Sequence, residues 1–332
     1  MYNIVLIGCG HMGTVHLDDI YMMEKVCIYG VVDTDINRAK EFAKKYNAKS
    51  YDTSYERYFS DKNTDIIICA TYPSSHLEIL KKCVKYNKHL LCEKPIAASI
   101  DEVKEFADIV RKAQIKVQIG YILRFNETYK TVAKMIQNGA LGSPLVIRMT
   151  QNHHVKDWKK YSALLSNASP IVDCGVHYAD ICRWFTKSEI SDTNGIGLRI
   201  DSEVPSDSYN YGLMTFKMTD GSIAYYEAGW GNTISAKNVK EFIGPLGRIE
   251  IIEREHRTCC QEEGDLIKYY KYPDKIYETI NVDCKRRPTG VQLAHLIKMI
   301  EKDIPAVPTI DEIYDCMLMI FKADEVIRRQ CI

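Results

Sequence analysis

Residues that could bind phosphate groups or move a proton occur at three places in the chain. The stretch Gly8 to Gly13 (GCGHMG) follows the apolar run NIVLI, and Glu93-Lys94-Pro95 follows the run HLLC. The third place, Asp173 to Asp180 (DCGVHYAD), combines carboxylates with an imidazole. Backbone N–H groups at a glycine turn bind phosphates, ammonium groups stabilise oxyanions, and imidazoles exchange protons near neutral pH. These three places are therefore the candidates for a cofactor and reaction site.

The glycine-rich stretch predicts a dinucleotide-binding turn. In such a turn, Gly8 makes the tight bend, Gly10 lets the backbone approach a pyrophosphate, and Gly13 lets the following helix pack closely on the strand. The N-terminus of that helix offers free N–H groups and a partial positive charge to the phosphates. His11 and Met12 lie inside the turn, so we expect them to contact the cofactor too.

The position of Asp33 strengthens this interpretation and indicates which cofactor binds. The second strand-like run, VCIYGVVD, ends in Asp33, 20 residues after Gly13. At this spacing a carboxylate binds the ribose hydroxyls of NAD. A carboxylate repels a 2'-phosphate, so NAD is expected rather than NADP. Arg38 lies close by and could soften that preference, which leaves NADP open.

Two further strand-like runs end in residues that should border the nicotinamide. Ligands of open parallel sheets lie beyond the carboxyl ends of the strands. The residues expected there are Ala70, Thr71, Tyr72, Pro73, His76, Glu93 and Lys94. A Glu-Lys pair is more commonly part of a solvated loop. At a strand end above a cofactor, however, a lysine can be desolvated, which lowers its pKa and makes it useful for catalysis.

The third place predicts a helix with a polar stripe. If residues 170–185 are helical, Asp173, His177 and Asp180 lie on one face. The alternative is a half-polar helix whose stripe faces water. No third ligand stands out beside these side chains, so we expect no metal site.

The order of the expected elements predicts two domains. Up to about residue 121, short apolar runs alternate with amphipathic segments, which is typical of a doubly wound parallel α/β sheet of the Rossmann type. From residue 122 the chain shows a helix, long strands with a hairpin at Asp220-Gly221, and two final helices. We therefore expect a Rossmann domain over 1–121 and an α+β domain with a large, mostly antiparallel sheet over 122–332.

Composition limits the range of partners. The 332 residues include 44 basic and 44 acidic side chains, so no net field attracts nucleic acid or a membrane surface, and a small molecule is the expected partner. The 12 cysteines contain no C-x-x-C pair, which favours a reduced, cytoplasmic setting over a disulfide scaffold. We read no signal peptide and no run of the roughly 20 apolar residues that a membrane span needs.

The motifs together resemble the Gfo/Idh/MocA family, named after glucose-fructose oxidoreductase and inositol dehydrogenase. The matching stretches are GCGHMG, ATYPSSH, CEKP, DCGVHYAD and the junction GYILRFNETY, in the expected order. The resemblance implies an NAD(P)-dependent oxidoreductase acting on a hydroxyl of a sugar, an inositol-like polyol or a sugar acid. It also implies a homodimer or homotetramer assembled through the second-domain sheet.

The resemblance implies roles for individual residues. Lys94 would hydrogen-bond the reacting hydroxyl, while Asp173 and His177 would bind the substrate and move the proton. The Lys94-Pro95 peptide bond would be cis, as it often is in the family.

Other residues are candidates for the substrate site from their position alone. His153, His154, Lys156 and Trp158 follow a second-domain strand, and Trp158 offers a flat apolar face to a sugar ring. Tyr121 and Arg124 lie at the domain junction. Residues of these types in loops are more often structural or simply exposed.

Two departures from the family pattern leave parts of the site open. Tyr72 stands where the family commonly has proline, and SNASPIVD replaces a glycine-rich approach to the Asp/His helix. Two other functions also remain open: an NAD-dependent glycoside hydrolase that oxidises its substrate transiently, and a catalytically silent NAD-binding sensor.

Overall fold

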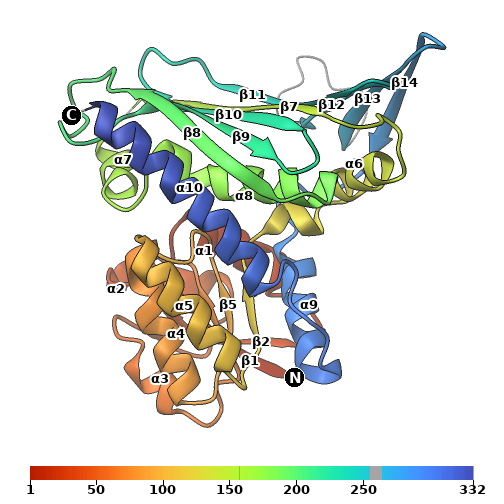
Figure 1. Cartoon of the computed structure of the whole chain (residues 1–332). Helices are drawn as coiled ribbons and strands as arrows, with labels where there is room; N and C mark the ends of the chain where they lie inside the picture. The colour runs from red at the N-terminus through yellow and green to blue at the C-terminus, as the bar shows by residue number, and fades with distance from the viewer. Residues whose placement is uncertain (157, 255–263, 332) are drawn as a thin grey trace. The chain divides into compact units, whose positions relative to one another are not determined.

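The computed structural model describes residues 1–156, 158–254 and 264–331, which form two compact units. The first unit contains residues 1–125 and 287–314, and the second contains residues 126–286 and 315–332. Figure 1 shows the elements of both units.

A six-stranded parallel sheet forms the centre of the first unit. Its strand order is β3-β2-β1-β4-β5-β6, so the order reverses between β1 and β4, which is where doubly wound sheets bind their ligands. The strands are β1 (Tyr2–Ile7), β2 (Val26–Val32), β3 (Tyr51–Asp52), β4 (Ile66–Cys69), β5 (His89–Cys92) and β6 (Val117–Ile119). The predicted Rossmann fold is confirmed.

Helices connect these strands and cover the sheet. They are α1 (His11–Ile20), α2 (Ile36–Lys45), α3 (Glu56–Ser60), α4 (His76–Lys85) and α5 (Ile100–Lys112), with short 3₁₀ helices at Pro73–Ser75 and Ile122–Phe125. The side chain of Asp35 caps α2 and that of Ser99 caps α5, each accepting from a free backbone N–H of the first turn. The β4 residues are buried, as the continuous apolar run IIIC predicts.

The second unit contains a mixed, mostly antiparallel sheet. Its described strands have the order β14-β13-β12-β11-β7-β10-β9-β8, and β7 and β10 pair in parallel. They are β7 (Val146–His154), β8 (Ile190–Leu198), β9 (Tyr211–Met218), β10 (Ile223–Gly231), β11 (Lys237–Gly244), β12 (Gly247–Ile252), β13 (Asp265–Lys271) and β14 (Ile276–Val282). The predicted α+β class is confirmed, and β9 and β10 form the hairpin predicted at Asp220-Gly221.

One face of this sheet packs against α8 (Pro170–Thr186), as Figure 1 shows. Alternate β7 residues supply the apolar side: Ile147 and Met149 are fully buried, while Arg148 between them is exposed. The ring of Tyr178 on α8 stacks on Tyr226 of β10, with 4.5 Å between centroids. The remaining helices that lie wholly in this unit are α6 (Glu127–Gln137) and α7 (Trp158–Leu165).

The division into units differs from the boundary expected at residue 121. Helix α9 (Thr289–Lys302) belongs to the first unit, where Leu293, Leu296 and Ile297 join the core cluster of β1 and β2. Helix α10 (Ile310–Cys331) starts in the first unit, and its residues from Asp315 belong to the second. The periodicity of α9 shows that it has an apolar face, but not which core that face covers.

The described residues show two further properties. None of the helices in the described ranges is long and apolar enough to cross a membrane. Nine cysteines of the described ranges are free thiols, and six of these nine are buried.

Candidate functional site

The glycine turn has the backbone geometry that its sequence predicts. Gly8 has φ +98°, and a Cβ there would lie 2.5 Å from the carbonyl oxygen of Ala70. A Cβ on Gly13 would lie 2.1 Å from the carbonyl oxygen of Gly8, so neither position tolerates a side chain. A Cβ on Gly10, by contrast, would meet no atom of the described chain within 4 Å. Open space above Gly10, at the N-terminus of α1, fits the approach of a pyrophosphate.

Asp33 is held beside this turn. One carboxylate oxygen accepts a hydrogen bond from the backbone N–H of Cys9 at 2.9 Å, and the other accepts from that of Asp35 at 2.9 Å. The guanidinium of Arg38 lies 3.7 Å from the carboxylate, in a largely exposed position. His11, inside the turn, is exposed and pairs with Arg287, while Met12 is half-buried.

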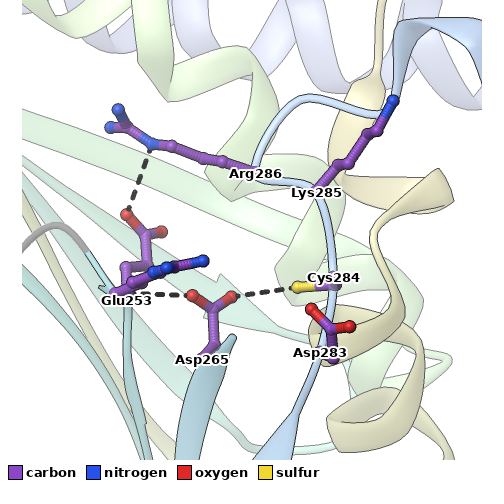
Figure 2. A pocket seen from close by; sticks show the side chains of 7 residues that line it. Glu253, Asp265, Asp283, Cys284, Lys285 and Arg286 are labelled. Carbon is purple, nitrogen blue, oxygen red and sulfur yellow. Dashed lines mark hydrogen bonds and ion pairs between the residues drawn. The ribbon is translucent and has the colours of Figure 1, made fainter. Parts of the chain in front are cut away.

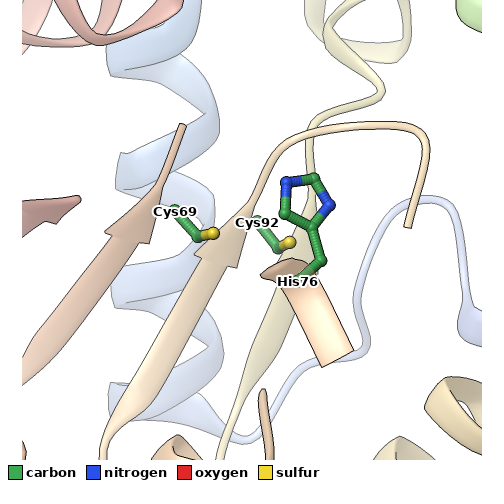
Figure 3. Close-up of side chains that lie close together, drawn as sticks. All are labelled: Cys69, His76 and Cys92. Carbon is green, nitrogen blue, oxygen red and sulfur yellow. The ribbon is translucent and has the colours of Figure 1, made fainter. Parts of the chain in front are cut away.

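A buried cluster of Cys69, His76 and Cys92 lies at the ends of β4 and β5 (Figure 3). The two cysteines are register partners on adjacent strands. His76 has one ring nitrogen 2.9 Å from the carbonyl oxygen of Pro95 and the other 3.2 Å from that of Thr71. Two carbonyl acceptors require an N–H on both nitrogens, which favours the imidazolium.

The charged forms of Cys69 and His76 stabilise each other. Burial alone would raise the pKa of the Cys69 thiol and lower that of His76. Hydrogen bonds and the mutual attraction of the two groups reverse both directions, so the pKa of Cys69 is lowered and that of His76 is raised. Because His76 is fully buried, it has no surface for direct contact with a cofactor and instead links the backbones at Thr71 and Pro95. The loop itself is more open, since Tyr72 is 46% exposed.

Glu93 and Lys94 have different environments. Glu93 is buried, and its carboxylate lies 2.7 Å from the imidazole of His16 on α1. Burial would raise the pKa of Glu93, but His16 and the Lys94 ammonium outweigh it, so this pKa is lowered. Lys94 is half-buried, and the Lys94-Pro95 peptide bond is cis, which confirms the expectation drawn from the resemblance.

The α8 helix presents Asp173 and His177 one turn apart. Its first turn begins at Pro170, and the side chain of Ser169 accepts a hydrogen bond from the N–H of Val172. Asp173 lies in that first turn, where the partial positive charge of the helix end favours a carboxylate. Asp173 is half-buried and His177 is 9% exposed, so the polar stripe is not a solvated helix face.

Four of the substrate-site candidates chosen by position have different surroundings. Tyr121 is buried, and Arg124 lies 3.3 Å from Glu312 in an ion pair. The ring of His153 is 3.3 Å from the amide of Gln151. Trp158 packs at the edge of a small apolar cluster around Trp230.

The second unit also contains a charged cavity of about 590 Å³ that the sequence analysis did not anticipate (Figure 2). Figure 2 shows Arg286 directed toward Glu253 and Cys284 toward Asp265. Arg286 Nε lies 3.9 Å from Glu253 Oε2, and Cys284 Sγ lies 3.4 Å from Asp265 Oδ2. The lining residues are Glu253, Arg254, Asp265, Asp283, Cys284, Lys285 and Arg286. They come from three separate segments of the sequence, so a local motif could not predict this cavity.

A buried lysine connects the wall of this cavity to α8. Lys240 on β11 lies 3.0 Å from Glu253 and 5.7 Å from the centre of the Tyr178 ring. Burial lowers the pKa of Lys240 even against the attraction of Glu253. For Glu253 the balance is opposite: burial raises its pKa, but Lys240, Arg286 and Tyr129 together lower it.

Fold and residues together define a class of protein. A glycine turn at the reversal point of a Rossmann sheet, with a carboxylate fixed beside it, marks a dinucleotide-binding unit. The same chain carries a half-buried lysine at a strand end and an Asp/His helix on an α+β unit. These features are typical of a two-domain nicotinamide-dependent oxidoreductase.

Two family models match the chain. The model described as "Oxidoreductase family, NAD-binding Rossmann fold" matches residues 2–121, and the "GFO/IDH/MocA C-terminal domain" matches residues 129–250. The chain belongs to the GFO/IDH/MocA family of NAD(P)-dependent oxidoreductases.

Individual relatives are distant but extend over most of the chain. Myo-inositol 2-dehydrogenase of Thermotoga maritima is 23% identical over 275 residues, which is 81% of each chain. The NAD(+)-dependent scyllo-inositol 2-dehydrogenase of Bacillus subtilis is 24% identical over 275 residues, covering 78% of this chain and 77% of the relative. The structure of aldose-aldose oxidoreductase from Caulobacter crescentus has the same fold, with a TM-score of 0.85 at 19% identity, and covers 99% of this chain and 98% of that one.

Proposed function

We propose that this protein uses NAD to oxidise a hydroxyl group of a sugar, an inositol-like polyol or a sugar acid, or to reduce the corresponding carbonyl. The observation that carries the proposal is the half-buried Lys94 at the carboxyl end of β5, on the same sheet edge as the Gly8 to Gly13 turn. A dinucleotide bound across that turn extends along the edge where Lys94 lies. The relatives named as inositol dehydrogenases support the substrate class.

The residues of the turn suit the cofactor. Gly10 leaves room for a pyrophosphate at the start of α1, Gly8 and Gly13 let the turn close tightly, and the two carboxylate oxygens of Asp33 are close to the turn. We propose that Asp33 also binds the adenosine ribose and disfavours a 2'-phosphate, which makes NAD the preferred cofactor. Other cofactor contacts proposed from position are His11, Met12, Arg38, Ala70, Thr71, Tyr72 and Pro73.

In the proposed mechanism, each charged side chain has one task. The Lys94 ammonium donates a hydrogen bond to the reacting oxygen and stabilises the negative charge that develops on it. His177 accepts the hydroxyl proton, and Asp173 orients the substrate or the imidazole. A nicotinamide held at the glycine turn would supply the hydride acceptor for oxidation and the hydride donor for reduction. In reduction the same groups act in reverse, with His177 donating the proton.

We also propose that copies of the chain associate through the eight-stranded sheet. The sheet face opposite α8 carries Arg148, Tyr225 and Glu241, which hydrogen-bond or pair with one another across strands. Light scattering after gel filtration would give a dimer or tetramer mass. A mass of about one chain at micromolar concentration would contradict this assembly.

A spectrophotometric screen tests the function. Purified protein is incubated with NAD and a panel of inositols, aldoses, polyols and sugar acids, and NADH absorbance is followed. We expect NADH formation with at least one substrate, and a loss of about 100-fold or more in kcat for H177A. K94A should also lose mainly kcat, whereas K85A, which removes an exposed lysine of α4, should retain it.

The outcomes separate the three functions. Release of a leaving group from a glycoside without net NADH would indicate a hydrolase that oxidises transiently. NAD binding without either reaction would indicate a sensor. Unchanged turnover in H177A would remove His177 from the mechanism.

A further inference from the structure

A buried hydrogen bond joins the helix after the glycine turn to the strand that ends at Lys94. His16 on α1 is 1% exposed and Glu93 at the end of β5 is 4% exposed. The His16 Nε2 and Glu93 Oε1 atoms are 2.7 Å apart, although the residues are 77 positions apart in the sequence. Both residues lie in the first unit. No motif in the sequence marks His16.

The direction of this hydrogen bond follows from the two groups. An ionised carboxylate can only accept, so Nε2 carries the proton and donates whether the ring is neutral or charged. The other ring nitrogen, Nδ1, is buried and has no hydrogen-bond partner among the described residues. The hydrogen bond to Glu93 is therefore the polar contact that orients the imidazole ring. Hydrogen bonds to an ionised acceptor are stronger than those between two neutral groups.

Glu93 is also confined on its other side. A Cβ on Gly120, which follows β6, would lie 2.8 Å from Glu93 Oε2. The glycine leaves just enough space for the carboxylate, so its position is set by His16 on one side and by the backbone at Gly120 on the other.

Glu93 influences Lys94 through charge. The titratable groups that act on Glu93 are His16 and Lys94, and Glu93 in turn acts on the thiol of Cys92. The backbone N–H of Lys94 also donates to the Glu93 carboxylate. Because attraction between two charges is mutual, a carboxylate held here stabilises the Lys94 ammonium.

We propose that His16 is a positioning residue that acts through Glu93 to keep the Lys94 side chain charged and in place at the end of β5. The inference rests on the proposed function for the catalytic role of Lys94. It extends that function by assigning a task to a residue outside the substrate and cofactor contacts. It also explains why the buried Glu93 carboxylate is retained inside the unit, where a charge is costly unless it is well paired.

The first test measures the charge of Lys94 without any substrate. Competitive acetylation with acetic anhydride at a series of pH values, followed by mass spectrometry of the peptides, gives the titration of each lysine amine. The variants are H16L, which removes the donor, and H16Q, whose amide N–H can replace Nε2–H. Exposed Lys85 in the same digest is the reference.

The expected result is specific to Lys94. In H16L the buried Glu93 carboxylate loses its donor and moves away or takes up a proton, so the titration of Lys94 should shift to lower pH by about one unit, which means about tenfold faster acetylation at pH 8 relative to Lys85. H16Q should stay close to the wild type. If H16L does not fold, E93Q keeps the side-chain shape, removes the charge and should shift Lys94 in the same direction. A Lys94 titration that is the same in wild type and in the folded variant would overturn the proposal.

The second test measures turnover with a substrate found in the NADH screen. H16L should lose about 10- to 100-fold in kcat, because a loosened catalytic group lies outside its productive geometry, while the KM for NAD stays within about threefold. H16Q should recover most of the loss. Equal kcat in H16L and wild type would overturn the positioning role. Absence of NADH formation by the wild type would contradict the proposed function. The acetylation result would still decide whether His16 controls the charge of Lys94.

Discussion

The buried pair of Lys240 and Glu253 gives a quantitative prediction about the second unit. Lys240 is 2% exposed, and its ammonium lies 3.0 Å from Glu253 and also bonds to Asn238. Glu253 further accepts from Tyr129 at 3.0 Å and from the amide of Asn238 at 2.8 Å. The variant K240M removes the ammonium, keeps a similar side-chain volume, and leaves Glu253 buried with fewer partners.

The expected loss follows from the partners that remain. Removing one member of a buried ion pair costs about 3–5 kcal/mol, mainly because the other charge stays behind. Glu253 keeps two hydrogen bonds and a guanidinium 3.9 Å away, so the low end applies. Of the two charges, that of Lys240 costs more free energy to bury, since burial lowers its pKa. We expect K240M to lower the free energy of unfolding by about 3 kcal/mol.

Urea unfolding of four proteins measures this value. They are the wild type, K240M, E253Q and K240M/E253Q. The double variant leaves no uncompensated charge, so it should be more stable than the sum of the single losses predicts, by about 2 kcal/mol. The pH dependence has a defined sign. The folded-state pKa of Glu253 lies below its unfolded value, so the stabilisation by the pair is present above about pH 5 and is lost as the pH falls through the folded pKa.

Two results would refute this reasoning. Additive losses in the double variant would mean that Lys240 and Glu253 are not coupled. A difference between wild type and K240M that stays constant from pH 7 to pH 3 would mean that the charge of Glu253 does not contribute to it.

Further predictions concern the glycine turn and Asp33. G13A should unfold more easily by about 3 kcal/mol, because its Cβ would lie 2.1 Å from the Gly8 carbonyl oxygen; thermal unfolding measures this, and unchanged stability would contradict the geometry. G10A should fold as the wild type does, since its Cβ meets open space, but should bind NAD at least tenfold more weakly by calorimetry. Wild-type affinity in G10A would show that no pyrophosphate approaches there. D33N should weaken NAD binding by about 10- to 100-fold and reduce the preference for NAD over NADP. An unchanged ratio of the NAD and NADP affinities would show that Asp33 does not select the cofactor.

Features that depend on residues close together in the sequence could be predicted from the sequence alone. The strand-helix alternation, the glycine turn and the spacing to Asp33 are local, because strand length and helix period decide which way each side chain faces. The hairpin at Asp220-Gly221 and the helix over DCGVHYAD are also present where local pattern placed them. For the same reason the resemblance of short motifs to a family identified the fold.

Contacts between distant segments were decided by the tertiary structure. Periodicity shows that α9 has an apolar face, but the core of β1 and β2 is what that face covers. His16 and Glu93 meet across 77 residues, and the cavity walls come from three segments that no local pattern relates. The physical reason is that burial energy is nonspecific: an apolar stripe can pack on any apolar surface, and a buried charge needs some partner. Which surface and which partner are selected depends on the packing of the whole unit.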